Sequence, residues 1–306
     1  MQTTVPRPAK KMDSLERKNL AKGLLFISPW LIGFLVFIAY PLVYSFVLSL
    51  TRYSGFQTPV WLGFQNYTRP LGDDLVWKSL SNTLFYAVWA VPIGLIIGLI
   101  LALAMNTRVR EIAIYRAAIY LPSILPAFAF AFIFIVLINP KFGLVNYALS
   151  AIGIPAETNY LGDPTSAKLV IVALSQLGAG GTALIYLAAL RGIPDTLYDA
   201  AKLDGAGPIR RFFSITLPLL SPITLFLAIT AINAGLQIFD AAYILTNGGP
   251  NNGTLFFLLY LYNNAFSYAQ LGYASALAVF LFIIGLVLAA ATYTLSQRFV
   301  NYELVS

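Results

Sequence analysis

The sequence contains no cysteine and no histidine among its 306 residues. These absences exclude disulfides, thiol redox chemistry and the Ser-His-Asp triad, and they remove the usual ligands of a zinc site. Charged residues are also scarce, at 10% of the chain, where a soluble domain has about 25%. We therefore expect no bound metal, no cofactor and no histidine proton relay.

The chain also lacks the Gly-x-x-x-x-Gly-Lys-Ser/Thr phosphate loop, so it cannot bind ATP by that route. No acidic residue lies in the middle of a long apolar run. Asp240 lies near the end of one run, and Asp195, Asp199 and Asp204 lie in a polar insert. Proton- or ion-driven carriers usually place titratable groups near mid-membrane. This argues against a stand-alone carrier or channel without excluding one, because backbone carbonyls can bind sodium unaided. The runs also hold no nucleophile–base set, which disfavours a membrane enzyme.

What the sequence has in abundance is apolar residues, at 59% of the chain with a mean hydropathy of +0.78. A membrane-spanning helix needs about 20 mostly apolar residues. Six apolar runs reach that length. The apolar segment 255–266 is too short to span, and we expect an interfacial or partly re-entrant external helix there. The predicted fold class is an all-α integral membrane protein with six transmembrane helices, at 24–50, 81–105, 112–138, 168–190, 215–238 and 273–295.

The basic residues indicate the orientation of these spans. Most of the 19 Lys and Arg residues lie in the N-terminal tail, in the second and fourth loops between spans, and in the C-terminal tail. The positive-inside rule places these segments and both termini in the cytoplasm, and it explains the net charge of +7 without a nucleic-acid partner. We expect a cytoplasmic tail at 1–23, a transmembrane domain at 24–296 and a second cytoplasmic tail at 297–306. The transmembrane domain includes a cytoplasmic insert at 191–216.

Small residues and prolines predict local features of the spans. Gly94, Gly98 and Ala102 recur every four residues, a stripe that lets helix backbones approach closely. Prolines within or beside the spans predict kinks. Transporters, receptors and membrane enzymes all contain such kinks, so the prolines select no function. They are Pro29, Pro41, Pro92, Pro122, Pro126, Pro218 and Pro222.

The insert between the fourth and fifth spans is long and patterned. A first short helix is expected to begin near Leu197, capped by Asp195 or Thr196, and to break at 205–208, where two glycines precede a proline. A second short helix is expected at 209–215. Because alanine and glycine side chains are small, the surface of the insert has little relief, and a groove in another protein can accept it. An ordinary loop is the alternative, but the pattern favours a docking element.

The insert resembles the EAA motif of binding-protein-dependent ABC importers, through the segments DAAKLDGAG at 199–207 and FFSITLP at 212–218. In that family the motif forms a coupling helix that docks on the ATPase subunit and transmits its closure. The family's usual first residue is Glu, and Asp199 keeps its charge. The resemblance implies ATPase coupling through Asp199, Ala200, Ala201, Asp204, Gly205, Ala206 and Gly207.

A second segment, FDAAYILTNGGP at 239–250, resembles carbohydrate permeases of the maltose-transporter type, in the form of their first permease subunit. The resemblance implies a non-enzymatic subunit of a di- or oligosaccharide importer in a bacterial or archaeal cell (inner) membrane. Its implied partners are a second homologous permease, an ATPase dimer that binds the ATP and an extracytoplasmic sugar-binding protein. An importer of another solute, such as a glycerol phosphate, an amino acid or a peptide, is the alternative. The lack of basic residues in the spans disfavours an anionic substrate.

Polar residues in the fourth and fifth spans are candidates for the substrate pathway. Asn233 and Gln237 are four residues apart and share a helix face. Amides within a membrane are costly unless they are paired, and bonds to neighbouring helices are the alternative role. In the family these two spans line the sugar site, and the glycines here suggest a wider cavity that depends less on stacking. The predicted pathway residues are Gln176, Gly178, Gly181, Asn233, Gly235 and Gln237.

Overall fold

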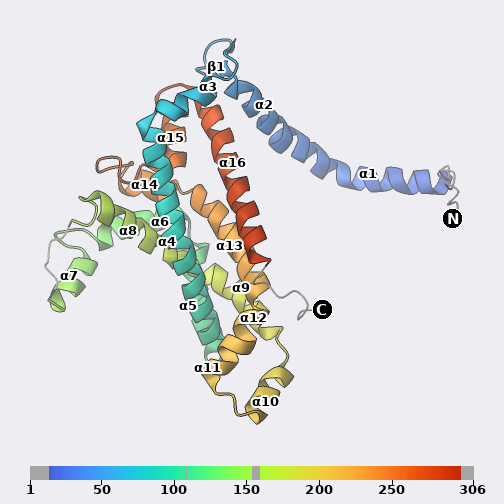
Figure 1. Cartoon of the computed structure of the whole chain (residues 1–306), viewed down its shortest axis with the longest axis vertical. Coiled ribbons are helices and arrows are strands. Elements are labelled where there is room, and N and C mark those ends of the chain that lie inside the picture. The colour runs from blue at the N-terminus through green and yellow to red at the C-terminus, as the bar shows by residue number, and fades with distance from the viewer. Residues whose placement is uncertain (1–13, 108, 154–158, 298–306) are drawn as a thin grey trace.

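The computed structural model describes residues 14–107, 109–153 and 159–297, and Figure 1 shows a bundle of helices. Within these residues the only strands are the antiparallel pair β1 (Thr51–Arg52) and β2 (Val60–Trp61). The basic residues Arg7, Lys10, Lys11, Arg108 and Arg298, which support the predicted orientation, lie outside the described residues.

The predicted all-α membrane class is confirmed. Among the described residues, five helical segments are long and apolar enough to cross a membrane, and a bent pair makes a sixth. The first and fourth segments each join two helices through an irregular turn. The spans are α1 (Ser14–Phe34) with α2 (Tyr40–Ser49), α4 (Asp74–Met105), the bent pair α5 (Ile112–Ile124) and α6 (Ala127–Leu137), α8 (Pro164–Ser175) with α9 (Ala179–Arg191), α13 (Ser221–Leu236) and α16 (Leu271–Ser296).

The third span differs from the continuous helix predicted for 112–138. Its two halves, α5 and α6, meet at an angle of 97°. Pro126 occupies the N-cap position of α6, and Leu125 before it is extended, with φ −69° and ψ 139°. A proline has no N–H for the helical ladder and disfavours helical dihedrals in the residue before it. The expected kink at Pro126 is therefore a complete break.

The first span stands away from the bundle. Its helix begins at Ser14, inside the expected N-terminal tail. A π-helical turn at Leu35–Ala39 joins α1 to α2. In Figure 1, the C-terminal end of α2 lies beside the upper end of α16, and α1 lies farther out to the right. Only 6% of the most apolar window of this span is buried, so its side chains need lipid or another subunit as a neighbour.

The bundle is packed around α4, as the stripe of small residues predicts. A Cβ atom added to Gly98 would lie 2.6 Å from Cγ2 of Thr182 on α9. One added to Gly94 would lie 3.2 Å from Oε1 of Gln176. Ala102 is fully buried. The stripe therefore brings α4 into close contact with the fourth span, which carries part of the predicted pathway.

The segment at 255–266 forms a short helix, α15 (Phe257–Tyr262), followed by a π-helical turn at Asn263–Ser267. Phe256, Phe257 and Leu259 are fully buried, and α15 packs against α4 and α16. The segment is therefore part of the packed bundle, and whether it is interfacial or partly re-entrant stays a prediction. The other short helices are α3 (Gln65–Thr68), α7 (Leu144–Ala151), α10 (Asp195–Leu203), α11 (Pro208–Arg211), α12 (Leu217–Leu219) and α14 (Asp240–Leu245).

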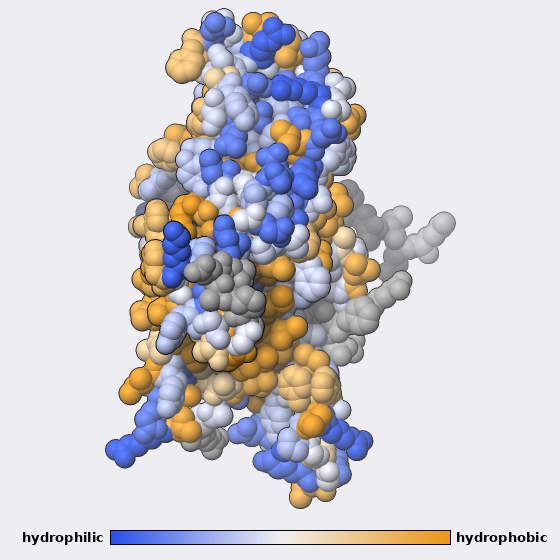
Figure 2. Space-filling view, turned by 90° about the vertical axis from the view of Figure 1, so that its left-hand side faces the viewer, coloured by the Kyte–Doolittle hydropathy of each residue, from blue (hydrophilic) through white to orange (hydrophobic). Residues whose placement is uncertain are grey.

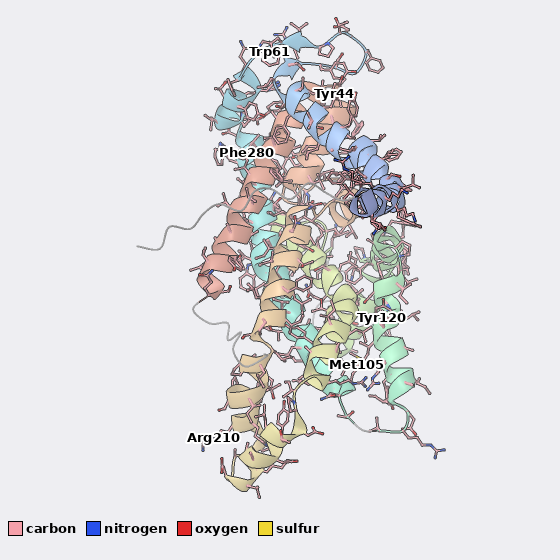
Figure 3. The ribbon with its side chains drawn as sticks, turned by 90° about the vertical axis from the view of Figure 1, so that its right-hand side faces the viewer. Tyr44, Trp61, Met105, Tyr120, Arg210 and Phe280 are labelled. Carbon is pink, nitrogen blue, oxygen red and sulfur yellow. The ribbon has the colours of Figure 1, made fainter. Side chains whose placement is uncertain are left out.

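The molecule has two polar ends separated by an apolar belt. The strands and α3 lie at one end, and α10 and α11 lie at the other (Figure 1). Figure 2 shows hydrophilic residues at both ends and hydrophobic residues between them. In Figure 3, Trp61 marks the first end and Arg210 the second. This distribution matches a protein that crosses a bilayer and presents a different surface on each side.

Candidate functional site

The insert forms a helical hairpin that projects from the bundle at the lower end of Figure 1. Its first helix, α10, begins at Asp195, and Pro194 occupies the N-cap position. The prediction that Asp195 or Thr196 caps a helix from Leu197 is therefore wrong. The helix begins two residues earlier, directly after a proline whose extended dihedrals end the previous turn.

The predicted break at the glycines is confirmed. Gly205 has a φ of +75°, a left-handed conformation that glycine adopts without steric cost. The N–H of Ala206 donates to the carbonyl of Ala201 at 2.8 Å, and the N–H of Gly205 donates to that of Lys202 at 3.0 Å. These two bonds form a Schellman motif, which satisfies the last carbonyls of α10. The turn between the two helices is thus fixed by backbone geometry.

The second half of the insert is longer than the helix predicted at 209–215. It begins as α11, passes through a π-helical turn at Phe212–Thr216 and continues into α12. The hydroxyl groups of Tyr198 and Thr216 lie 2.9 Å apart and share a hydrogen bond. This bond ties α10 to the segment that leads into α13.

The predicted coupling residues lie together on this hairpin. Ala201 and Ala206 are half-buried, and the other five are exposed. Asp199 also pairs with Lys202 at 2.8 Å on the surface of α10. The hairpin further exposes large apolar side chains that the sequence reasoning missed: Leu203 is 90% exposed and Ile209 75%. Such side chains beside small residues indicate a surface that a partner covers.

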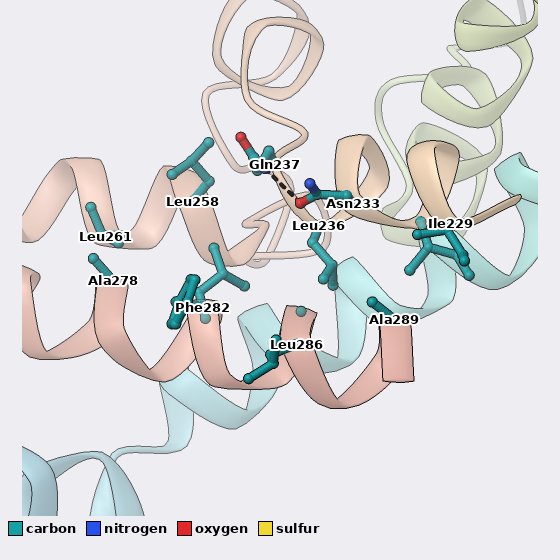
Figure 4. Close-up of a pocket in the computed structure, with 13 residues that line it drawn as sticks. Ile229, Asn233, Leu236, Gln237, Leu258, Leu261, Ala278, Phe282, Leu286 and Ala289 are labelled. Carbon is teal, nitrogen blue, oxygen red and sulfur yellow. Dashed lines mark hydrogen bonds between the residues drawn. The ribbon is translucent and has the colours of Figure 1, made fainter. Parts of the chain in front are cut away.

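The pathway residues Asn233 and Gln237 share a face, as predicted. Nε2 of Gln237 donates to Oδ1 of Asn233 at 2.8 Å, and both side chains are exposed. Figure 4 shows them at the edge of a cavity of about 430 Å³ between α13, α15 and α16, where they stand among apolar side chains such as Leu258 and Phe282. They supply polar groups to an otherwise apolar wall.

Other pathway residues line two further cavities. Gly178 and Gln237 line one of about 280 Å³, together with Asp240. Gly178 also lines one of about 210 Å³, with Gln176 and Gly235. The structure thus brings five of the six residues to neighbouring cavities along α9 and α13. The sixth, Gly181, lines none of these three cavities, and its N–H donates to Oγ of Ser123 at 2.9 Å.

Gln176 and Gly235 also have packing roles. Nε2 of Gln176 donates to the carbonyl of Val172 in its own span at 2.8 Å and to that of Ala90 on α4 at 3.5 Å, so the alternative of a bond to a neighbouring helix applies to this residue. A Cβ atom added to Gly235 would lie 3.5 Å from Cβ of Ala87 on α4. Contact of any of the six residues with a sugar stays a prediction.

Sequence reasoning missed an aromatic cluster beside Gln237. The ring of Phe239 stacks on that of Tyr243 at 5.3 Å and lies 4.9 Å from that of Tyr262. Phe239 lines the same cavity as Gln237. The spacing of four between Phe239 and Tyr243 was the available signal, but Tyr262 joins the cluster only through the tertiary fold.

Comparisons with known proteins agree with this architecture. The family described as "Binding-protein-dependent transport system inner membrane component" matches residues 94–301. The probable ABC transporter permease protein YesP of Bacillus subtilis (strain 168) is 40% identical over 298 residues, which cover 96% of each chain. The lactose transport system permease protein LacF of Rhizobium radiobacter is 38% identical, covering 84% of this chain and 87% of its own.

A solved structure shows the same fold. It is the crystal structure of a bacterial ABC transporter involved in the import of the acidic polysaccharide alginate. One of its chains matches with a TM-score of 0.81 at 24% identity, covering 94% of this chain and 100% of that chain. The overall helical arrangement is therefore one that a chain of a solved transporter also adopts.

Proposed function

Because the chain belongs to the inner membrane components of binding-protein-dependent transport systems, we propose that it is a permease subunit of an ATP-driven importer of di- or oligosaccharides. The observation that carries the proposal is the hairpin of α10 and α11, which stands outside the bundle and exposes small and apolar side chains at the EAA-like motif. The lactose permease relative supports the sugar substrate.

The energy for transport comes from partner subunits in this proposal. This chain has no phosphate loop, so ATP binds to two ATPase subunits that contact the hairpin through residues 199–207. Closure of the ATPase dimer moves the hairpin, and the hairpin moves α13. A driven switch requires each state to be stabilised by a different ligand. ATP is the ligand on the cytoplasmic side, and the loaded binding protein is the ligand on the other.

The remaining partners follow from the same surfaces. A second homologous permease completes the pathway, because the three cavities open at the side of a single chain. The exposed apolar helix α1 has lipid or that permease as its neighbour. The hairpin end faces the cytoplasm, where we also place both terminal tails, and the end with the strands faces the sugar-binding protein.

The sugar passes along α9 and α13 in this proposal. Asn233 and Gln237 offer amide groups to sugar hydroxyls, and Gly178 leaves space beside them. The described residues that line the three cavities include no Lys or Arg. An importer of anionic solutes such as glycerol phosphates is therefore a weaker candidate, since an anion in an apolar wall needs a positive partner.

Reconstitution tests the proposal. The chain is purified with a partner permease, an ATPase and a binding protein from the same organism and placed in proteoliposomes. We expect uptake of lactose, maltose or a longer oligosaccharide that requires ATP and every subunit. Uphill sugar uptake by this chain alone would show a stand-alone carrier. ATP-driven uptake of glycerol 3-phosphate, with no sugar of the panel transported, would show the alternative substrate class.

A further inference from the structure

A further cavity lies where the hairpin joins the bundle, and the proposed mechanism gives it no role. Its volume is about 610 Å³. The residues that follow α4, the end of α9 and the start of α10 line it, and Arg116 reaches it from α5. We name it the hairpin-base cavity. Since its walls come from both the spans and the hairpin, a ligand held here contacts both.

The hairpin-base cavity carries an excess of positive charge. Its charged lining residues, among those described, are the two bases Arg116 and Arg191 and the acid Asp195. Asp195 lies in the first turn of α10, where the free N–H groups of the helix stabilise a negative charge. Within the described residues neither arginine forms a salt bridge. The cavity therefore suits an anion.

The side chain of Arg116 is held in place but lacks acceptors. Its Nη2 donates to the carbonyl of Met105, the last residue of α4, at 2.8 Å. Figure 3 shows Met105 in the lower half of the molecule, above the hairpin that carries Arg210. Nε of Arg116 is buried and has no hydrogen-bond partner. Because a buried donor without an acceptor is costly, the oxygens of an anion in the cavity would stabilise this guanidinium.

The helix that carries Arg116 favours a lipid as the source of the anion. No residue of α5 is buried, and its exposed side chains include Ile114, Tyr115 and Leu121. The bases of the loop before α5 place this end of the helix at the cytoplasmic side, and tyrosine is enriched where a membrane meets water. Apolar surface beside a basic cavity accommodates both the acyl chains and the headgroup of an anionic lipid.

We infer that the hairpin-base cavity holds the phosphate group of an anionic phospholipid from the cytoplasmic leaflet, bound by Arg116 and Arg191. The planar guanidinium matches the oxygens of a phosphate through parallel hydrogen bonds. Basic pockets between membrane helices on the cytoplasmic side bind acidic headgroups in this way. The inference goes beyond the proposed function and takes from it only the orientation of the hairpin end.

The bound lipid connects the spans to the hairpin. Tyr198 of α10 lines the same cavity as the two arginines. A phosphate between them contacts the first arm of the hairpin and the ends of the spans together. A ligand that binds only the folded arrangement stabilises it, so the lipid favours the position of α10 that the structure shows.

The test uses the transporter with all its subunits, reconstituted in equal amounts of phosphatidylglycerol and phosphatidylcholine. Native mass spectrometry after extraction counts the lipids that stay bound. We expect the wild type to retain phosphatidylglycerol in preference, and Arg191→Gln to lower that retention about tenfold, the effect of losing one hydrogen bond to a charged group. Arg191 is exposed at the end of α9, so its replacement disturbs no packing. Arg110→Gln removes the same charge at an exposed residue outside the cavity and should retain the lipid as the wild type does.

Thermal unfolding in nanodiscs gives a second measurement. We expect the wild-type midpoint to rise as phosphatidylglycerol replaces phosphatidylcholine, because a ligand of the folded state stabilises it. The midpoint of Arg191→Gln should not respond to the lipid. Arg116→Gln also loses the bond to Met105, which can lower its midpoint in every lipid. That variant is therefore judged by its response to phosphatidylglycerol, which should be absent as well.

Three results overturn the inference. Wild-type retention of phosphatidylglycerol by both Arg191→Gln and Arg116→Gln removes the site. An equal loss in Arg110→Gln shows a general attraction of basic residues for acidic lipid. If inorganic phosphate raises the wild-type midpoint in nanodiscs of phosphatidylcholine, and Arg191→Gln abolishes that rise, the cavity takes a free phosphate instead of a lipid. None of these measurements depends on sugar uptake, so a failure of the proposed function is seen separately.

Discussion

The hydroxyl of Tyr198 on α10 lies 2.9 Å from the Oγ1 atom of Thr216 in the π-helical turn that follows α11. Thr216 is buried and Tyr198 is half-buried. The two residues belong to opposite arms of the hairpin. The contact therefore connects the arm proposed to dock on the ATPase with the arm that continues into α13. In the proposed mechanism, a displacement of α10 reaches the fifth span through this bond as well as through the turn at Gly205.

Tyr198→Phe removes this bond and keeps the ring. Loss of one hydrogen bond costs about 1 kcal/mol, which is too little to unfold the transporter. We expect the complex to assemble while the ratio of sugar-stimulated to basal ATPase activity falls several-fold, because α10 can move without α13. The assay compares ATPase rates with and without the loaded binding protein.

A double-mutant cycle separates coupling from local damage. Thr216→Val and the double variant with Tyr198→Phe complete the cycle, and the two residues contact each other directly. If the bond carries the effect, the double variant is no worse than the worse single variant. Additive losses, or full stimulation in Tyr198→Phe, would show that the hydroxyl pair takes no part in transmission.

A bulky side chain on the exposed face of α10 tests whether this helix docks on the ATPase. Ala200 is exposed in the middle of the helix, so Ala200→Trp leaves the fold of this chain intact and adds a large side chain to the proposed contact. We expect a properly inserted permease that no longer transports, measured by sugar uptake in cells and by co-purification of the ATPase. Ala200→Ser is the control and should transport normally.

The glycine of the same motif gives a less direct test. Gly205 has a φ of +75°, so any side chain there strains the backbone before a partner is considered. A transport defect in Gly205→Trp would mix strain with steric exclusion. Normal uptake by Ala200→Trp, where no such strain exists, is the result that contradicts docking through this face.

The spans could be predicted from the sequence because each depends on a local property, a run of about 20 apolar residues. The turn at Gly205 was also predictable, since a left-handed position favours glycine. The 97° angle between α5 and α6 was not. Pro126 predicts a break, but the direction of the chain after a break depends on what the next helix packs against, and α6 packs on α14 more than 100 residues later in the chain.

In the candidate site, too, local patterns could be predicted from the sequence and tertiary contacts could not. The shared face of Asn233 and Gln237 follows from helical spacing, and their hydrogen bond confirms it. The contact of Phe239, which precedes α14, with Tyr262 on α15 joins residues far apart in the chain, so no local pattern reveals it. The burial of α15 was equally hidden, because a short apolar segment can pack inside a bundle or lie on its surface. Only tertiary packing decides between these two outcomes.

Two neighbouring glycines of α9 differ sharply in the space around them. A Cβ atom on Gly180 would collide with the backbone carbonyl of Ile119 and lie 2.8 Å from Oγ of Ser123. One on Gly181 would meet nothing nearer than 4.0 Å. We expect Gly180→Ala to destabilise the protein by about 1–3 kcal/mol through overpacking. Gly181→Ala is the matched control, and its better helix propensity should add up to about 1 kcal/mol. Thermal unfolding in detergent measures both, and equal midpoints would contradict the packing of α9 on α5.

The amide pair on α13 gives the last prediction. Asn233 and Gln237 are exposed and bond to each other, so their removal exposes no buried polar group. We expect Asn233→Ala and Gln237→Ala each to lower sugar uptake at subsaturating sugar about tenfold, the effect of losing one or two hydrogen bonds of about 1 kcal/mol each. Because the pair acts together, the double variant should lose much less than the hundredfold that additivity requires. The affinity of the free binding protein for sugar is unchanged by these variants, and the thermal midpoint of the permease should be unchanged too.

Gln176→Ala provides the contrast, since its amide bonds within the fourth span and its loss should lower the thermal midpoint as well as sugar uptake. Wild-type uptake in both α13 variants would place the sugar on another face, and the pathway along α9 and α13 would have to be abandoned while the coupling hairpin kept its role.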